Sequence, residues 1–452
     1  MPFRWTPREH LSLGIYVFKW LLILLPVAGA IGSACAFFLW SLDQVTALRW
    51  QNPWLLYLLP LAGLAVGAIY HWLGSSVAGG NNLIVEQIHQ PGGGVPSRMA
   101  PLVLFGTLVT HLFGGSAGRE GTAMQMGGSI ASTFARRLPF LKQHHRTLLM
   151  AGIAAGFGAV FGTPLTGAVF AMEVLAIGTM NYAALIPCLI ASIVGDWTCS
   201  AWGIGHTQYT IALVEVPHLN LILLAKVALA SVVFGLASRL FGELAHGFQF
   251  IFKKAIPYPV ARPAVGGVLV IALVFLLGTR DFLGIGVTSP DPAAVTILSS
   301  FREGGAHSWS WFWKILFTCI TISSGFKGGE VTPLFFIGAA LGNTLALLIG
   351  APVDLFAGLG FIAVFAGAAN TPLACTLMGV ELFGSTYVVY FAVACFLSYL
   401  FSGHSGIYLS QQIGTPKLDW AGLPEKTSLR SVREKQASVI GKFFRKKRSE
   451  GK

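Results

Sequence analysis

The stretch Gly118-Arg119-Glu120-Gly121-Thr122 decides the architecture of this chain, because its pattern, G-x-E-x-T, returns in the second half as Gly328-Gly329-Glu330-Val331-Thr332. A second motif, Thr-Pro-Leu followed by a glutamate at a fixed spacing, also occurs in both halves: Thr163-Pro164-Leu165 with Glu173, and Thr371-Pro372-Leu373 with Glu381. Two motifs that recur in the same order at nearly the same separation indicate a chain built from two related halves.

The composition places these halves in a membrane. Hydrophobic residues make up 54% of the 452 residues, charged residues only 11%, and 54 residues are glycine. Soluble domains carry about 25% charged residues and about 7% glycine. These values exclude an ordinary soluble enzyme, a disordered chain and a disulfide scaffold. They predict an all-α polytopic membrane protein whose helices pack through small residues.

Several apolar runs are longer than the roughly 20 residues that one bilayer crossing needs. Leu11–Trp40, Leu148–Ile177 and Leu355–Phe401 are each expected to contain more than one helix. Glycine-rich breaks at 114–121 and 325–329 predict short or broken helices, which survive at membrane depth only beside protein or a water-filled cavity. With an internal repeat, this pattern is typical of a transporter whose site lies between its halves. The letters alone leave open whether the repeat is inverted or parallel.

Charge and hydropathy divide the chain into segments. We expect an N-terminus at 1–10, a first membrane repeat at 11–205, a linker at 206–218, a second repeat at 219–412 and a basic tail at 413–452. The net charge is +12, and much of it follows Lys426. By the positive-inside rule, the basic loops at 136–146 and 253–262 and both termini are expected in the cytoplasm. The tail is expected to meet lipid headgroups rather than nucleic acid.

Glu120 is the first candidate functional residue, because an ionisable group at bilayer depth is costly and marks a site by default. A structural ion pair with Arg119 is the alternative. Glu330 and Thr332 occupy the matching place in the second half, where facing helix N-termini would bind an anion. For Glu330 the alternative is a neutral packing carboxyl. Glu173 and Glu381 are expected to be structural, and Asn81 offers either amide donors or a plain N-cap.

A soluble-enzyme motif also needs an explanation. Residues 114–118 match G-x-S-x-G, with Ser116 as the candidate nucleophile and His111 nearby. That motif needs a strand–turn–helix context, and no parallel-sheet pattern surrounds it here, so a membrane serine hydrolase is the weaker hypothesis. The cysteines are scattered without metal-ligand spacing, and no nucleotide-binding motif is present. We therefore expect no metal, no cofactor and no enzymatic activity.

At these motifs the sequence resembles the CLC superfamily of anion channels and proton-coupled anion antiporters, from about Leu11 to Gln412. Residues 118–122 resemble the family's G-R-E-G-P stretch, which implies that Glu120 is the gating and proton-transfer carboxylate. Ser405-Gly406-Ile407-Tyr408 resembles the segment with the central anion-coordinating tyrosine, here Tyr408. The resemblance implies a CLC-type homodimer, each subunit with two inverted repeats, its own pore and helices of uneven length.

The departures from the family pattern point to one branch. Chloride-handling members carry G-S-G-I-P where this chain has Gly80-Asn81-Asn82-Leu83-Ile84. The proline of G-R-E-G-P is Thr122, and the phenylalanine of G-G-x-F-x-P is Val331. This set resembles the fluoride-exporting CLC-F branch of bacterial fluoride/proton antiporters. Fluoride holds its water tightly, so a pore must replace that water with close hydrogen-bond donors.

The resemblance implies a fluoride/proton antiporter of the bacterial inner membrane, with a chloride/proton antiporter or chloride channel of the same family as the alternative. The residues implied to bind the anion are Gly80, Asn81, Asn82, Leu83, Ile84, Gly118, Arg119, Gly121, Thr122, Val331, Thr332 and Tyr408. Glu330 is a second carboxylate in the proton or anion path. Chloride antiporters carry an inner proton-transfer glutamate after Glu173, where this chain has Val174, so protons either use another route or are not coupled.

Overall fold

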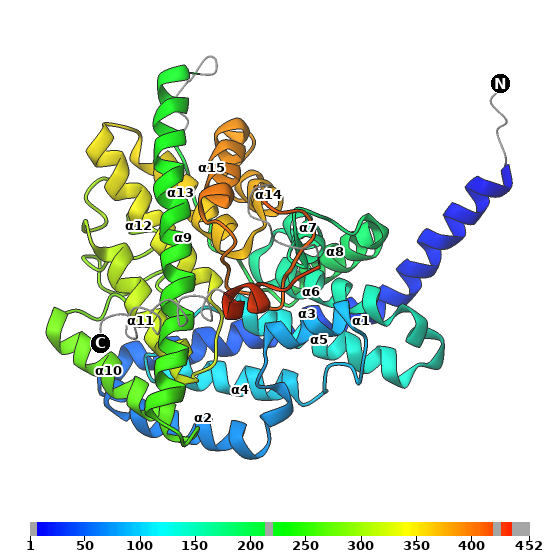
Figure 1. Ribbon diagram of the computed structural model, residues 1–452, viewed down its shortest axis with the longest axis horizontal. Helices are drawn as coiled ribbons and strands as arrows, with labels where there is room; N and C mark the ends of the chain where they lie inside the picture. Colours follow the sequence, from blue (N-terminus) through cyan, green and yellow to red (C-terminus); the bar gives the residue numbers. More distant parts are fainter. Residues whose placement is uncertain (1–6, 213–219, 419–425, 436–452) are drawn as a thin grey trace, which may run out of the picture.

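The computed structural model describes residues 7–212, 220–418 and 426–435, and nearly all regular structure in them is helical (Figure 1). The helices of the first half are α1 (Pro7–Gln51), α2 (Leu59–Trp72), α3 (Asn81–His89), α4 (Met99–Leu112), α5 (Glu120–Arg137), α6 (His145–Phe161), α7 (Pro164–Glu173) and α8 (Leu185–Ala201). Those of the second half are α9 (Leu221–Ala255), α10 (Ala261–Leu277), α11 (Ser310–Ser324), α12 (Val331–Ile349), α13 (Val353–Ala369), α14 (Pro372–Phe383) and α15 (Val388–Phe401).

The remaining elements are short. Single 3-10 turns or short 3-10 helices lie at Pro53–Leu58, Ser75–Val77, Pro139–His144, Tyr182–Ala184 and Ser299–Phe301. One parallel pair of two-residue strands, β1 (Ala176–Ile177) and β2 (Gln412–Ile413), departs from the all-α expectation. This pair joins the end of the first half's helix α7 to the segment after α15. The expected N-terminus, linker and basic tail fall partly on 1–6, 213–219, 419–425 and 436–452, outside the described residues.

The expectation of more than one helix was wrong for Leu11–Trp40. A single helix, α1, runs through it for 45 residues, with Pro26 in its interior. At about 1.5 Å per residue it is roughly 68 Å long, more than twice the about 30 Å thickness of a bilayer core. In Figure 1 its N-terminal part projects away from the rest of the molecule. An apolar run longer than one crossing can therefore belong to one extended helix.

For the other two long runs the expectation is confirmed, since Leu148–Ile177 contains α6 and α7, and Leu355–Phe401 contains α13 to α15. The local sequence explains the breaks. Gly162 and Asn370 end α6 and α13 in the left-handed conformation, with φ of 69° and 57°. Pro164 and Pro372 then begin the next helices, where a missing backbone N–H costs nothing. The same stop-and-restart signal thus works in both halves.

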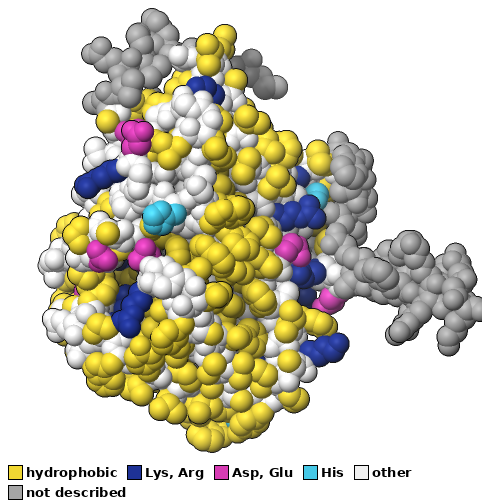
Figure 2. Space-filling model, turned by 90° about the vertical axis from the view of Figure 1, so that its left-hand side faces the viewer, with side chains coloured by type: hydrophobic (Ala, Val, Ile, Leu, Met, Phe, Trp, Pro, Cys, Tyr) yellow, Lys and Arg dark blue, Asp and Glu magenta, His cyan; other side chains and the backbone are white. Residues whose placement is uncertain are grey.

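The outer surface of the molecule is apolar. Figure 2 shows a broad hydrophobic face with few charged side chains. Leu276 and Leu348 expose 74% and 75% of their surface. Among the described residues, five helices are long and apolar enough to cross a membrane. A surface of this kind belongs in lipid, because contiguous exposed apolar patches of such extent are rare in soluble monomers.

The internal repeat extends to helix packing. A Cβ on Gly127 of α5 would lie 2.1 Å from the carbonyl oxygen of Gly152 in α6. A Cβ on Gly338 of α12 would lie 2.0 Å from the carbonyl oxygen of Gly360 in α13. In each half, then, two consecutive helices (α5 with α6, and α12 with α13) cross at a pair of glycines, which lets their backbones come into contact.

We predict that Gly338→Val lowers the free energy of unfolding by at least about 1–3 kcal/mol, because the new side chain meets backbone that cannot yield. Thermal unfolding in detergent, followed by loss of the monodisperse peak, measures the change. Gly247→Val on α9 is the matched control, since a Cβ there would meet nothing within 4 Å. Equal midpoints for Gly338→Val and wild type would contradict the close crossing of α12 and α13.

Candidate functional site

The two G-x-E-x-T stretches meet in the structure. Gly118 and Gly329 exchange both backbone hydrogen bonds as an isolated antiparallel bridge, with N–O distances of 2.6 and 2.7 Å. Helix α5 begins at Glu120 and helix α12 at Val331, just after the paired glycines. The N-termini of one helix from each half therefore lie together at the interface between the halves, as the repeat predicted.

Glu120 is fully buried, and its carboxylate crosses to the other half. Oε2 accepts hydrogen bonds from the backbone N–H groups of Thr332 and Arg119, each at 3.1 Å, and Oε1 accepts from the Thr332 hydroxyl. The carboxylate is thus an anion held at the N-terminus of α12, where backbone donors and the helix dipole favour negative charge.

The alternative, an ion pair with Arg119, is present but secondary. Arg119 Nε lies 3.6 Å from Glu120 Oε1 and makes no hydrogen bond within the described part of the chain. The hydrogen bonds that position Glu120 come from Thr332 and from backbone N–H groups. The Arg119 side chain therefore contributes charge to the site, whereas its backbone N–H helps to fix the geometry.

A third helix N-terminus and a second carboxylate lie on the other side of Gly121. A Cβ on Gly121 would be 3.0 Å from Asn81 Nδ2, 3.1 Å from Gly329 Cα and 3.8 Å from Glu330 Oε2. Glu330 of the second half thus approaches the start of α5, while Glu120 of the first half reaches the start of α12. Asn81, 8% exposed, adds a side-chain donor from the start of α3.

Asn81 is not an N-cap, so that alternative is wrong. Gly80 is the N-cap of α3, with φ of 55°, and no side chain caps this helix. Asn81 Oδ1 is buried without a hydrogen-bond partner among the described residues. The Asn81 side chain thus has its nitrogen near Gly121 and an amide oxygen that can accept a hydrogen bond from a water molecule or another donor.

The remaining predicted residues surround this centre in different ways. Thr122 Oγ1 lies 2.7 Å from Thr107 Oγ1 on α4, so its hydroxyl is already engaged. Asn82 Oδ1 accepts from the Ser410 backbone N–H at 2.9 Å, which ties α3 to the segment that carries Tyr408. Gly118 lies at the centre through its pairing with Gly329, and Val331 is the first residue of α12. Gly80 is the N-cap of α3, which also contains Leu83 and Ile84.

Tyr408 is 2% exposed, and its hydroxyl contacts the Met124 sulfur at 3.9 Å. Met124 lies one turn along α5 from Glu120, so the phenol stands beside the first turn of the helix that begins the site. A thioether is a weak acceptor, which leaves the phenol O–H available to a better one.

Glu173 and Glu381 are structural, as predicted, and they act reciprocally between the halves. Glu173 at the end of α7 accepts from the backbone N–H groups of Leu373 and Ala374 at the start of α14, at 3.0 and 2.8 Å. Glu381 in the last turn of α14 accepts from the corresponding amides at the start of α7 at 2.9 and 2.8 Å. Each helix therefore caps the other.

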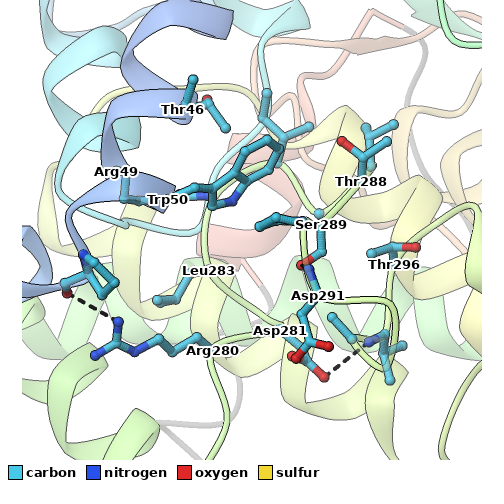
Figure 3. Close-up of a pocket in the computed structure, with 18 of the residues that line it drawn as sticks. Thr46, Arg49, Trp50, Arg280, Asp281, Leu283, Thr288, Ser289, Asp291 and Thr296 are labelled. Atoms are coloured by element: carbon cyan, nitrogen blue, oxygen red, sulfur yellow. Dashed lines mark hydrogen bonds between the residues drawn. The ribbon is translucent and has the colours of Figure 1, made fainter.

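A cavity of about 780 Å³ reaches Arg119 and was not foreseen from the sequence. Figure 3 shows Thr46 and Trp50 of α1 on one side, facing Thr288 and Thr296 of the loop before α11. Arg119, which immediately precedes Glu120 in the chain, is one of the residues that line this cavity.

One buried and one partly buried cation near this cavity were also missed. Lys314 is fully buried on α11 and donates to the carbonyl oxygens of Phe282 and Gly284 at 3.1 and 2.9 Å. Arg49, in the last turn of α1, donates to the His111 carbonyl oxygen at 3.3 Å. A lysine inside the apolar run Trp309–Ile322 was the available signal, since such a residue is expensive and marks function or architecture.

The serine hydrolase hypothesis was wrong. Ser116 is fully buried, and its Oγ lies 2.9 Å from Thr318 Oγ1 rather than beside a base. His111 Nε2 lies 3.5 Å from the Gly118 carbonyl oxygen. Nucleophilic catalysis needs the serine and histidine within hydrogen-bond reach of each other. In the described residues no group of three or more His, Cys, Asp or Glu side chains is placed to hold a metal ion.

Helix N-termini and buried carboxylates at the centre of an apolar two-half bundle define a membrane protein that handles anions. The sequence matches the family described as voltage gated chloride channel over residues 62–403, and the chain belongs to this family, the CLC family. It is a transport protein rather than an enzyme. It is 47% identical over 94% of its length to a "Chloride/fluoride channel protein" of Pseudomonas syringae pv. tomato, and covers 93% of that protein.

Comparison with solved structures gives the same family. The chain is similar to a crystal structure of a CLC-type fluoride/proton antiporter, with a TM-score of 0.81 and 33% identity over 90% of this chain and 99% of the other. It also shares the fold of a slow cyanobacterial Cl⁻/H⁺ antiporter, with a TM-score of 0.71 at 19% identity, covering 85% of this chain and 94% of the other. The predicted CLC family and fold are therefore confirmed.

We predict that Glu173→Ala lowers the free energy of unfolding by about 1–3 kcal/mol, because the amides at the start of α14 lose a buried acceptor. Glu173→Gln retains one acceptor and is expected to lose less. Thermal unfolding in detergent measures both, with the exposed Glu303→Ala as control. If Glu173→Ala unfolds at the wild-type midpoint, Glu173 does not cap α14.

Proposed function

We propose that this protein exchanges fluoride for protons across the bacterial inner membrane, exporting fluoride at the expense of an inward proton gradient. The observation that carries the proposal is the Glu120 carboxylate, which occupies the N-terminus of α12 as an anion would. The similarity to a CLC-type fluoride/proton antiporter and to a chloride/fluoride channel protein supports the choice of ion.

The exchange follows from competition for one set of donors. While Glu120 is ionised, it holds the backbone N–H and the hydroxyl of Thr332. A protonated Glu120 is a poorer acceptor, so it releases these donors and fluoride takes its place. Deprotonation then returns the carboxylate and expels the fluoride. One carboxyl group thereby carries a proton inward and allows fluoride to move outward.

Fluoride selectivity is assigned to close donors. Fluoride loses its hydration shell only where several donors approach it at short range. Asn81 Nδ2, Thr332 and the phenol of Tyr408, whose hydroxyl otherwise contacts only the weak acceptor sulfur of Met124 among the described residues, supply side-chain donors. The starts of α3, α5 and α12 supply backbone N–H groups. Chloride is larger and less strongly hydrated, so it gains less from so compact a site. Chloride/proton antiport or chloride conduction stays the alternative, because the name of the Pseudomonas relative includes chloride.

The inner proton route is assigned to Glu330. Both oxygens of Glu173 accept hydrogen bonds from the start of α14, and Val174 follows it where chloride antiporters have a glutamate. Glu330 lies near Gly121 at the start of α5, next to the proposed anion path, and is partly accessible. This position supports the proposal that Glu330 passes protons to Glu120 from the other side of the site.

The arrangement of the whole protein is part of the proposal. The antiparallel Gly118–Gly329 pair and the reciprocal caps of Glu173 and Glu381 support two inverted repeats, 11–205 and 219–412, joined by a linker at 206–218. Family membership supports a homodimer embedded in the lipid bilayer. The excess of Lys and Arg in the loops and in the tail, 413–452, supports a cytoplasmic location for both termini.

We predict that Glu120→Gln abolishes proton movement coupled to fluoride, because an amide cannot carry the proton. Proteoliposomes with a fluoride electrode outside and a pH dye inside measure both fluxes. The exposed Glu303→Gln is the control and is expected to match wild type. Undiminished proton uptake during fluoride efflux in Glu120→Gln would contradict the role of Glu120.

We predict that Asn81→Ser lowers the fluoride-to-chloride flux ratio by about two- to tenfold, the value of one hydrogen bond of ordinary strength at the site. Parallel efflux assays with fluoride and chloride electrodes measure the ratio. Asn52→Ser at the end of α1 is the matched control. An unaltered ratio in folded Asn81→Ser would remove Asn81 from the selectivity mechanism.

A further inference from the structure

A short C-terminal segment binds against the residues around Tyr408. We call residues 426–435 the C-terminal strap and residues 405–413 the Tyr408 segment. Backbone hydrogen bonds join the two: Leu429 N to Gln411 O and Arg430 N to Leu409 O, both at 2.9 Å, and Lys426 N to Ile413 O at 2.7 Å. The strap therefore contacts the Tyr408 segment on the C-terminal side of Tyr408.

Apolar contacts hold the strap in place. Leu429 and Val432 are each 3% exposed and pack with Ile177 and Ile413, which are fully buried. Ile177 and Ile413 are partners in the β1–β2 pair. The strap is thus anchored on the only sheet in the described residues, and its charged side chains are left to point elsewhere.

Two glutamates connect the strap to the Tyr408 segment, and each contacts both. Glu86 Oε1 accepts from the Ser410 hydroxyl at 2.7 Å and lies 3.1 Å from Arg430 Nη1. Glu243 accepts from the Ser405 hydroxyl through Oε1 at 3.2 Å, and its Oε2 lies 2.9 Å from Arg433 Nη2. One serine precedes Tyr408 and the other follows it.

The glutamates belong to different helices. Glu86 lies on α3, the helix that begins with Asn81, and Glu243 lies on α9. Figure 1 shows the C-terminal segment, in red, beside these two helices. A further contact on the α3 side, from the Ser410 backbone N–H to Asn82 Oδ1, reinforces this connection. The Tyr408 segment is therefore tied at one end to an anion-site helix and at the other end to α9.

We propose that Arg430 and Arg433 are positioning residues: through Glu86 and Glu243 they fix the serines on either side of Tyr408, and so set the place of its hydroxyl in the anion path. The proposal rests on the proposed function of Tyr408. Without the arginines each glutamate still accepts the hydrogen bond from its serine, but it loses the ion pair that holds its carboxylate from the other side. The Tyr408 segment then gains freedom, and fluoride passes without waiting for the proton step.

The expected size of the effect is modest. The side chains of Arg430 and Glu86 are 49% and 45% exposed, and those of Arg433 and Glu243 are 33% and 47% exposed. Ion pairs with this exposure change an equilibrium by about 1.5- to 5-fold each, and salt weakens them. The buried contacts of Leu429 and Val432 keep the strap folded in the arginine variants, so loss of folding does not obscure the result.

The experiment measures protons moved per fluoride in proteoliposomes of full-length protein, for wild type, Arg430→Ala, Arg433→Ala and the double variant. We expect each single variant to lower the ratio by about 1.5- to 5-fold, with the double variant lowest. Arg430→Lys restores most of the ratio, because the charge is kept. Arg137→Ala, in the last turn of α5, is the control and keeps the wild-type ratio.

A double-mutant cycle tests whether the arginine acts through the glutamate. Glu86→Gln keeps an acceptor for Ser410 but removes the charge partner, so Glu86→Gln/Arg430→Ala is expected to be no worse than either single variant. Raising ionic strength with sodium gluconate is expected to lower the wild-type ratio toward that of the double arginine variant. Additive losses, or wild-type ratios in both arginine variants, would overturn the positioning role.

The result for the wild-type protein distinguishes a failure of this proposal from a failure of the proposed function. Wild-type vesicles that move no fluoride, or move it without protons, contradict the proposed antiport itself. Coupled exchange in wild type with unchanged coupling in every strap variant contradicts only the role of the strap.

Discussion

A pair of backbone hydrogen bonds between Gly118 and Gly329 brings the two halves of this molecule together at the site. The contact needs glycine on both sides. A Cβ on Gly118 would lie 2.8 Å from Glu120 Oε2, and one on Gly329 would lie 2.7 Å from the Gly121 nitrogen. Because the two backbone segments of this bridge are so close, the helices that follow them begin side by side, and the Glu120 side chain reaches Thr332.

This closeness gives the site its electrostatic character. The donors around the Glu120 carboxylate are backbone N–H groups and one hydroxyl, with Arg119 at a longer distance. Neutral donors of this kind bind a negative charge without trapping it as a full positive charge would, which suits a site that must release its anion. In the proposed exchange, the same donors serve the carboxylate and fluoride in turn.

The rest of the fold maintains the contact between the halves. The reciprocal caps of Glu173 and Glu381 join α7 and α14, and the glycine crossings at Gly127 and Gly338 hold each site helix against its neighbour. Lys314 fixes the loop that walls the cavity leading to Arg119. Carboxylates and cations are costly inside a membrane. In this protein these charged side chains form hydrogen bonds with backbone N–H and C=O groups that broken helices and loops leave without partners.

The sequence by itself determined the membrane class and the CLC family, and it singled out Glu120 and Thr332 as candidates, because these depend on composition and on local motifs such as G-x-E-x-T. The presence of more than one helix in Leu148–Ile177 and in Leu355–Phe401 was also predicted, whereas the structure located the breaks at Gly162 and Asn370. The length of α1 was not predicted, since an apolar run does not show whether one helix extends beyond the bilayer. Contacts between distant residues also required the tertiary structure: Thr332 with Glu120, Thr107 with Thr122, and Glu86 with both Ser410 and Arg430. Each of these joins segments whose separation in the chain carries no periodic signal, so only the folded arrangement of the helices decides which polar groups meet.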